Sequence, residues 1–371
     1  MPSAPPRATF PYPIVEATLD NGLAVVAVPL DTPGLAAHYV AVRTGSRNEV
    51  EPGLSGFAHF FEHMMFRGTP RFTPERYNDV LKRLGADGNA FTTDDWTCYH
   101  VTAAASALAT VMDLEADRFM NLRYGVEAFQ KEAGAVLGEY NKNASIPINA
   151  LVEKLHDVAY TTHTYKHTTM GFLRDIENMP RQYDHSLAFF ERWYRADNAA
   201  LVVAGDVVPD EVFALARRYF GPWRPGVAPF TTPREPEQAG ERRAHIPWAS
   251  PTLPLLALAY HAPAFDPDDA DGRALDVVAQ AYFAPTSPLY RQLVLERQWV
   301  EGIGAGAEDH RDPGLFLVIA RVKEAERVDD VRAAIEGALA GAATVPLPAD
   351  RLLAVSSRIR YGFLSGLQTP D

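Results

Sequence analysis

Two histidines and a glutamate stand close together in the stretch 56–66, in the order H-x-x-E-H. His59 and His63 are four residues apart, so on a helix their imidazoles project from one face. Glu62 precedes the second histidine and lies at the edge of that face. Two neutral imidazoles suit a zinc ion, and a nearby carboxylate that does not bind the metal can take a proton from water. The spacing therefore indicates a zinc site with an adjacent general base.

The alternative to a metal site is a core helix whose two histidines are hydrogen-bonded within the protein. With 11 His among 371 residues, an H-x-x-E-H motif arises by chance in roughly a few per cent of such chains. Burying two imidazoles and a carboxylate among Phe and Met side chains is costly without a compensating ion, which favours the metal. A zinc site also needs a third protein ligand, with the fourth position left to water.

A pair of glutamates further along the chain offers that third ligand. Glu132 and Glu139 are seven residues apart in an expected helix over 126–142, so both carboxylates face the same way. The usual fate of such residues is a solvated acidic stripe. The residues between the two are small and apolar, however, which indicates a closely packed face. We expect at least one of the two glutamates to be buried and partnered.

The histidine-bearing stretch needs neighbouring elements to hold it. No Gly or Pro interrupts residues 57–66, and Pro and Gly residues bracket them, which predicts one short buried helix. Expected strands are 15–19 and 23–28, joined by an Asn-Gly turn, then 37–42, 87–93, 96–102 and 198–203. Other expected helices are 73–84, 105–121, 126–142 and 209–219.

Residues 224–246 are rich in Pro, Gly and charge and show no periodicity, so they are the clearest linker. After them the order of the first half recurs, which indicates an internal repeat. Its expected strands are 255–261 and 314–322, and its expected helices are 271–283, 287–297 and 350–366. Aligning residues 56–58 with 272–274 sets Leu275, Val278 and Ala279 opposite His59, Glu62 and His63.

The predicted fold class is therefore α+β, with two repeated units that each pack a mostly antiparallel β-sheet with helices. Residues 1–223 form the expected zinc-bearing domain and 224–246 the linker. Residues 247–371 form a second, homologous domain that has lost the metal residues. It is shorter than the first domain, and we expect it to be cut short at its C-terminus.

Length and charge limit the classes of function. A chain of 371 residues has room for two domains, and a net charge of −12 argues against a nucleic-acid partner. The single cysteine, Cys98, excludes an internal disulfide. No apolar run reaches the roughly 18–20 residues of a membrane span. Residues 1–7 lack the apolar core of a signal peptide, so a cytoplasmic location is expected, or a periplasmic or secreted one if the N-terminus is processed.

Taken together, these residues resemble the insulinase/pitrilysin family of zinc metallopeptidases, the inverzincins. The resemblance covers nearly the whole chain. It rests on residues 19–23, 59–63, 88–92, the Glu132/Glu139 pair and 194–206, where Ala196 replaces the usual Pro. The resemblance implies the fold of the mitochondrial processing peptidase and a zinc endopeptidase that cleaves peptides or small unfolded polypeptides.

The resemblance also implies roles for particular residues. His59, His63 and Glu139 would bind one zinc ion per chain, Glu62 would be the general base, and Glu132 would support the site. Asn89 and Ala90 would lie on an edge strand to which the substrate backbone adds.

Family members pair two such two-domain halves around an inner chamber. We therefore expect a second half as partner, in a homodimer or on a chain that supplies an Arg and a Tyr.

Two other functions remain open. One is a non-catalytic peptide-binding or scaffold subunit of a processing-peptidase-like complex. The other is a small-molecule lyase with the same H-x-x-E-H helix, whose single-domain size fits a repeated chain poorly. His163 and His167 are also four residues apart, but Gly171 and the threonines around them indicate a loop without a second metal site.

Overall fold

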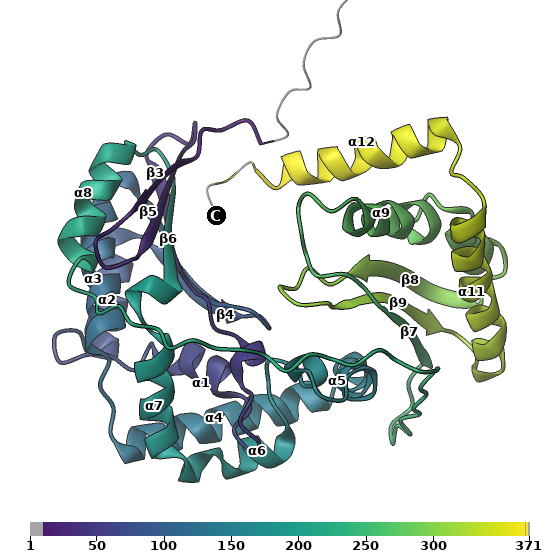
Figure 1. Cartoon of the computed structure of the whole chain (residues 1–371), viewed down its shortest axis with the longest axis horizontal. Coiled ribbons are helices and arrows are strands. Elements are labelled where there is room, and N and C mark those ends of the chain that lie inside the picture. The colour runs from purple at the N-terminus through teal and green to yellow at the C-terminus, as the bar shows by residue number, and fades with distance from the viewer. Residues whose placement is uncertain (1–9, 368, 370–371) are drawn as a thin grey trace, which may run out of the picture. The chain divides into compact units, whose positions relative to one another are not determined.

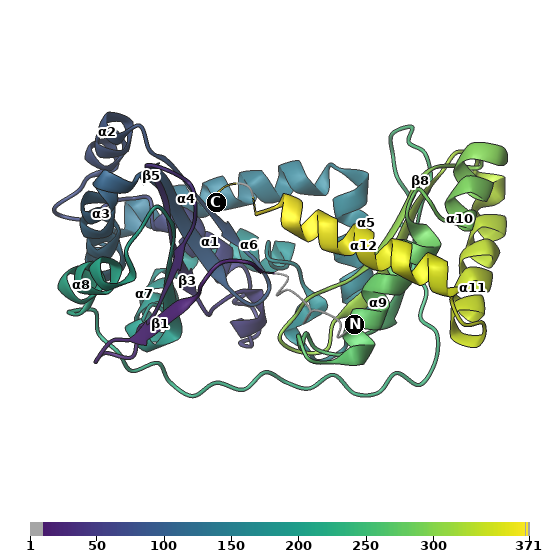
Figure 2. The same cartoon turned by 90° about the horizontal axis from the view of Figure 1, so that it is seen from above.

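The computed structural model describes residues 10–367 and 369 (Figures 1 and 2). The chain divides into two compact units. The first contains residues up to Asn141 together with Thr162–Glu235, and the second contains Lys142–Thr161 and Pro236–Gly366. Residues 142–161 thus group with the second unit, although the predicted first domain, residues 1–223, includes them. Residues 224–246 contain no helix or strand.

Six strands form the sheet of the first unit within the described residues, in the order β1-β2-β6-β3-β5-β4. Only β2 and β6 pair in parallel, and all other neighbours are antiparallel. The strands are β1 (Val15–Thr18), β2 (Ala24–Pro29), β3 (Leu35–Val42), β4 (Asp87–Thr92), β5 (Thr97–Ala104) and β6 (Ala199–Gly205). The predicted hairpin, the pair formed by 87–93 and 96–102, and the strands expected at 37–42 and 198–203 are confirmed. The strand β4 is an edge of this sheet.

Helices cover one face of this sheet. They are α1 (Phe57–Met64), α2 (Pro74–Leu84), α3 (Leu108–Asn121), α4 (Val126–Ala144), α6 (Leu173–Asn178), α7 (Tyr183–Trp193) and α8 (Pro209–Phe220). In both cartoon views α3 and α8 lie together along the sheet (Figures 1 and 2). Strand side chains alternate between the two faces, and those toward the helices, such as Val40 and Val101, are buried. This packing makes the first unit a layered α+β domain.

The second unit repeats this order on a smaller scale. Its described strands β7 (Leu255–His261), β8 (Val300–Ala307) and β9 (Leu315–Val322) form an antiparallel sheet in the order β7-β9-β8. Its helices are α5 (Pro147–Ala159), α9 (Ala270–Val278), α10 (Pro288–Tyr290), α11 (Val328–Thr344) and α12 (Ala349–Ser365), and π-helical turns extend α9 and α10 to Phe283 and Glu296.

The predicted internal repeat is confirmed at the level of topology. The elements β3-α1-α2-β4-β5-α3 and β7-α9-α10-β8-β9-α11 follow the same order. In the first sheet β5 lies between β3 and β4, and in the second sheet β9 lies in the same way between β7 and β8. Leu275 and Val278 on α9 are partly buried and pack against the apolar core that contains Ala279, the first residue of the π-helical turn. The residue-by-residue alignment of α9 with α1 remains a prediction.

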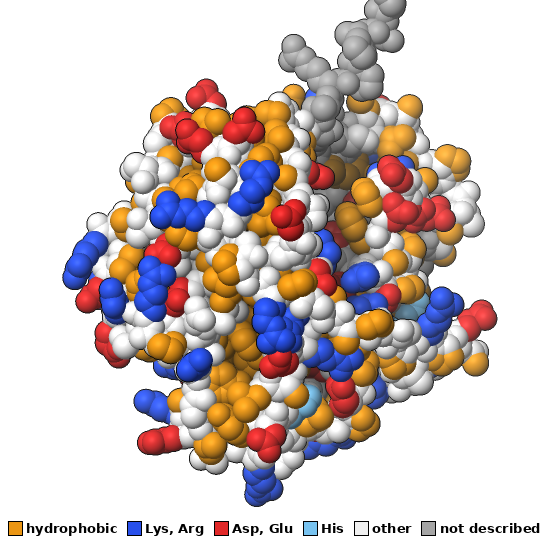
Figure 3. Space-filling model, turned by 60° about the vertical axis from the view of Figure 1, so that its left-hand side comes forward, with side chains coloured by type: hydrophobic (Ala, Val, Ile, Leu, Met, Phe, Trp, Pro, Cys, Tyr) orange, Lys and Arg blue, Asp and Glu red, His pale blue; other side chains and the backbone are white. Residues whose placement is uncertain are grey.

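The surface and the helices carry two further observations. Among the described residues on the face drawn in Figure 3, Lys and Arg side chains are interspersed with Asp and Glu. No single helix in the described chain has the length and apolar character of a membrane span. Residues 325–344 and 349–365 meet that criterion only as a pair, bent by 109°. The N-terminal residues 1–7 lie outside the described part.

Candidate metal centre

The N-terminus of α1 is held by the buried side chain of Glu49. Gly56 precedes the helix with φ of 93°, a left-handed conformation that favours glycine. The Oε2 atom of Glu49 accepts a hydrogen bond from the Gly56 N–H at 2.6 Å, and its Oε1 atom accepts one from the Ala58 N–H at 2.7 Å. Free N–H groups at a helix N-terminus need such acceptors. Glu49 therefore fixes where α1 begins.

Aromatic packing fixes the rotation of α1 about its axis. Phe57, Phe60 and Phe61 are fully buried. The Phe60 ring lies 5.1 Å from that of Phe129 on α4, and the Phe61 ring lies 5.3 Å from that of Phe189 on α7, measured between centroids. Because this face is committed to the core, His59, Glu62 and His63 are left on the remaining surface of the helix.

Three predicted ligands come together beside α1. The Oε2 atom of Glu139 lies 3.6 Å from Nε2 of His59 and 3.2 Å from Nε2 of His63. Ligand atoms about 2.1 Å from a tetrahedral zinc ion are separated by about 3.4 Å, so these distances suit a common ion. Within the described residues, this is the one group of three His, Cys, Asp or Glu side chains with such proximity.

Glu132, one of the two candidate glutamates, lies behind His63. Its Oε1 atom accepts a hydrogen bond from Nδ1 of His63 at 3.0 Å, and its Oε2 atom accepts one from Nε of Arg67. The Glu132 side chain is 1% exposed, against 35% for Glu139. The expectation that at least one glutamate is buried and partnered is therefore confirmed. A carboxylate on Nδ1 fixes the ring and leaves Nε2 available to a metal.

The two imidazoles lie in different electrostatic environments. Burial, reinforced by the neighbouring His63, lowers the pKa of His59 to about 4, so its ring is neutral at neutral pH. The hydrogen bond to Glu132 raises the pKa of His63. Burial opposes ionisation of Glu132, but the hydrogen bonds from His63 and Arg67 outweigh it and lower its pKa. Glu132 is therefore an ionised carboxylate that accepts hydrogen bonds from His63 and Arg67.

Glu62 points to the edge strand and not into the ligand group. Its Oε2 atom accepts a hydrogen bond from the Thr92 hydroxyl, at 2.6 Å, at the end of β4. Burial raises the pKa of Glu62, although the Thr92 hydrogen bond acts in the opposite direction. A carboxylate beside a metal site that does not bind the ion can accept and return a proton. The position of Glu62 thus suits a base that does not bind the metal.

The predicted substrate residues lie on the same strand. Asn89 pairs with His100 and Ala90 with Tyr99, and in the described chain β5 is the only strand beside β4. The Asn89 side chain is exposed, and its Oδ1 atom accepts a hydrogen bond from the Ala90 N–H at 2.9 Å. An extended peptide that adds to this edge would place one of its own carbonyl oxygens where Asn89 Oδ1 now accepts the Ala90 N–H.

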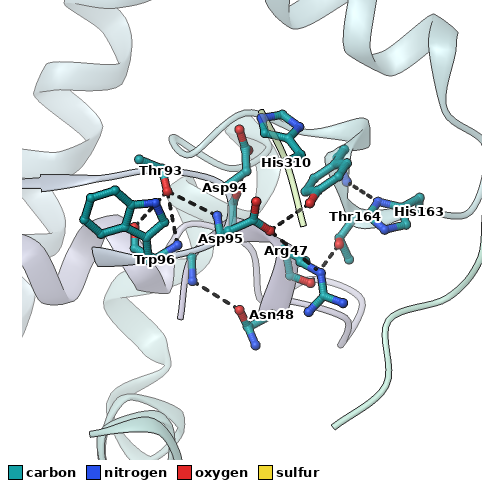
Figure 4. A network of polar contacts seen from close by, with 12 residues as sticks. Arg47, Asn48, Thr93, Asp94, Asp95, Trp96, His163, Thr164 and His310 are labelled. Carbon is teal, nitrogen blue, oxygen red and sulfur yellow. Dashed lines mark hydrogen bonds and ion pairs between the residues drawn. The ribbon is translucent and has the colours of Figure 1, made fainter. Parts of the chain in front are cut away.

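The second histidine pair belongs to a structural network. His163 accepts a hydrogen bond from the Tyr165 N–H through Nδ1, and the Tyr165 hydroxyl donates to Asp95 at the β4–β5 turn. The Thr164 hydroxyl donates to the Arg47 carbonyl, in the network of Figure 4. These contacts secure the loop around the turn. Neither His163 nor His167 belongs to the ligand group found among the described residues.

Two residues of the site, Arg67 and Thr92, were missed by the sequence reading. Arg67 stands four residues after His63, a spacing that repeats the His59–His63 interval, and Thr92 stands two residues after Ala90. Neither spacing alone shows which carboxylate the side chain will meet.

Comparison with known proteins gives the family. The insulinase family of peptidases, M16, matches residues 25–172, and the M16 inactive domain matches residues 182–353. A relative named zinc protease PqqE, from Helicobacter pylori, is 31% identical over 309 residues, which is 82% of this chain and 68% of the relative. The chain belongs to the insulinase family. It spans about half the length of further curated relatives named zinc proteases.

Solved structures share the insulinase-family fold. The crystal structure of a protease from Helicobacter pylori matches with a TM-score of 0.90 and 28% identity, and it covers 97% of this chain and 87% of that one. The periplasmic protease PqqL from Escherichia coli matches with a TM-score of 0.73 and 21% identity, over 97% of this chain but 41% of that one. At 21% identity, the match to PqqL supports a shared fold only.

Proposed function

We propose that this chain is a zinc-dependent endopeptidase. The observation that carries the proposal is the convergence of His59, His63 and Glu139 on one point, with Glu62 beside that point but bonded elsewhere. Three protein ligands leave a fourth position open, which is the arrangement of catalytic and not of structural zinc sites. Zinc in the names of the relatives supports the choice of ion.

Side chains of this chain transfer the proton and orient the ligands around the ion. Zinc held there would provide the Lewis acidity that makes water nucleophilic near neutral pH and that stabilises negative charge on a peptide carbonyl. Glu62 accepts a proton from the attacking water and then delivers it to the leaving amine. Glu132 keeps the His63 ring oriented, with Arg67 holding its second oxygen.

An extended peptide is the substrate class that this site favours. Strand β4 lies at a sheet edge and its residue Thr92 contacts the base, so a peptide added along β4 passes Glu62. Main-chain pairing reads extended shape and little sequence. Asn89 and Ala90 are the proposed contacts, which suits short peptides or unfolded polypeptides.

The proposed working form includes a second family half. The chain covers 77% of the first half of PqqL but only 41% of the whole protein. The partner is a second copy of this chain or a separate chain that carries an Arg and a Tyr toward the substrate. Strong peptide hydrolysis by a monodisperse monomer would contradict this part of the proposal.

A chelator-sensitive peptidase assay tests the activity. The Glu62→Gln variant is expected to keep one zinc per chain and to lose hydrolysis by at least about 100-fold. Equal hydrolysis by the variant and the wild type would overturn the proposal. The rival function is a non-catalytic peptide-binding or scaffold subunit of a processing-peptidase-like complex. Zinc at one per chain without any peptidase activity, alone or with a partner half, would support that rival.

A further inference from the structure

One hydrogen bond joins the proposed base to the proposed substrate strand. Glu62 belongs to α1 and Thr92 is the last residue of β4, and the Thr92 hydroxyl lies 2.6 Å from Oε2 of Glu62. The two residues are 30 positions apart in the chain. The contact therefore depends on the fold and not on local sequence.

The chemistry of the two groups fixes the direction of the bond. An ionised carboxylate can only accept, so the Thr92 hydroxyl donates. The other hydroxyl nearby is that of Thr97, at 3.5 Å across the strand pair, and it has a better acceptor in the Thr44 carbonyl at 2.9 Å. Thr97 is 1% exposed, so its hydroxyl is held in that bond. The Thr92 proton is therefore free to be donated to Glu62.

We propose that Thr92 is a positioning residue that holds the carboxylate of Glu62 beside the substrate strand. The proposal rests on the proposed endopeptidase function and deepens it. The Thr92 hydroxyl donates to Oε2 of Glu62, and the Thr92 backbone N–H also contacts this carboxylate. Thr92→Val therefore removes the hydroxyl's bond and keeps the backbone contact. Since Asn89 and Ala90 lie on the same strand as Thr92, a peptide paired with them is held at a set distance from the base.

A structural role for Thr92 predicts a different pattern of variants. Threonine is β-branched and suits a strand, and valine has the same shape and an equal or higher strand preference. Serine keeps the hydroxyl but loses the branch. If only the strand matters, Thr92→Val is harmless and Thr92→Ser is damaging. If the hydroxyl positions Glu62, the order is reversed.

The experiment compares Thr92→Val and Thr92→Ser in the full chain, with zinc and with any partner half needed for activity. The matched control is Thr102→Val on β5, because no hydrogen bond of the Thr102 hydroxyl is seen within the described residues. The readouts are kcat and KM on a fluorogenic peptide, zinc per chain and the structure of each variant.

We expect Thr92→Val to lower kcat by roughly 10- to 100-fold, with KM within about twofold and zinc unchanged at one per chain. Thr92→Ser should retain at least about a third of wild-type kcat, and Thr102→Val should be unchanged. A crystal structure of Thr92→Val should show the Glu62 carboxylate displaced from its wild-type position. That readout does not depend on activity.

Wild-type kcat for Thr92→Val, or an undisplaced Glu62 carboxylate in its structure, would overturn the proposal. Equal losses in both Thr92 variants would also overturn it, because the hydroxyl would then not be the cause. Glu62→Gln separates this outcome from failure of the proposed function. If Glu62→Gln stays active, the endopeptidase mechanism itself is wrong. If Glu62→Gln is inactive while Thr92→Val is fully active, only the role of Thr92 is wrong.

Discussion

The Oε1 atom of Glu132 lies 3.0 Å from Nδ1 of His63. This contact turns the opposite nitrogen of the ring toward Glu139, two helical turns further along α4. One helix thus provides both a proposed ligand and the group that orients another ligand.

The small residues between the two glutamates do not all form the closely packed face that their sequence predicts. Ala133 and Val136 are buried, but Gly134 and Gly138 are exposed, and a Cβ at either glycine would meet no atom within 4 Å.

Replacing Glu132 should weaken zinc binding without abolishing it. In Glu132→Gln the His63 ring loses a charged acceptor and Arg67 loses its partner, so the zinc dissociation constant should rise by roughly 10- to 100-fold. Competition with a chromophoric chelator measures this constant. The exposed Glu127→Gln on the same helix is the control. Unchanged zinc affinity in Glu132→Gln would show that Glu132 does not support the site.

Arg67 should matter less than Glu132, because it acts on the far oxygen of that carboxylate. Arg67→Met keeps much of the side-chain length and removes the charge. We expect the zinc dissociation constant to rise by roughly 3- to 10-fold, less than for Glu132→Gln. The same competition titration checks the order, and a larger loss from Arg67→Met than from Glu132→Gln would contradict it.

The start of α1 should be sensitive to a single methyl group. A Cβ at Gly56 would lie 2.3 Å from Cδ1 of Ile176 and 3.1 Å from the Met170 carbonyl, at a φ of 93°. Gly53 has a similar φ of 83° but open space around its Cβ position, so Gly53→Ala is a matched control. Gly53→Ala should cost about 1 kcal/mol of unfolding free energy. Gly56→Ala should cost about 1–3 kcal/mol more for overpacking.

Urea unfolding of the two glycine variants measures the difference. Equal stability of Gly56→Ala and Gly53→Ala would contradict the packing argument, since both carry the same backbone strain.

His38 should make the first unit sensitive to acid. Burial lowers its pKa to about 4, with Glu115 opposing and Arg118 adding to the shift. Between pH 6.5 and 4 the unfolded chain binds a proton that the folded chain does not, so stability falls as the pH falls through this window. At pH 5 the loss is about 2 kcal/mol relative to pH 7.5. His38→Leu should remove it.

Urea unfolding at pH 7.5 and pH 5 checks this prediction by comparing wild type with His38→Leu. The exposed His245→Leu serves as control. If wild type and His38→Leu lose the same stability between the two pH values, His38 is not the group responsible.

The elements that hold the site could be predicted because they have strong local patterns. The Asn-Gly turn predicts the β1–β2 hairpin, and Thr73-Pro74 with Gly85 predicts the ends of α2. Strand β8 was not predicted, because every second residue from Gly302 to Gly306 is glycine. Glycine is rare in strands, and few of the β-branched residues that indicate a strand are present. The sequence reading also missed α5, α6, α7 and α11. The grouping of residues 142–161 with the second unit depends on tertiary packing.

The same distinction holds within the site. The four-residue interval between His59 and His63 follows from helix geometry, so it is readable in the sequence. The roles of Arg67 and Thr92 cannot be read from the sequence, because each side chain contacts a carboxylate on another element. Their contacts depend on how α4 and β4 pack around α1.

Anomalous X-ray diffraction at the zinc absorption edge tests the central claim most directly. Crystals of the zinc-loaded chain should show one peak about 2.0–2.2 Å from Nε2 of His59, Nε2 of His63 and a carboxylate oxygen of Glu139. The peak should remain in Glu62→Gln and disappear in His63→Ala. A zinc-loaded wild type with no peak at these three atoms, or with Glu62 bound to the metal in place of Glu139, would contradict the account.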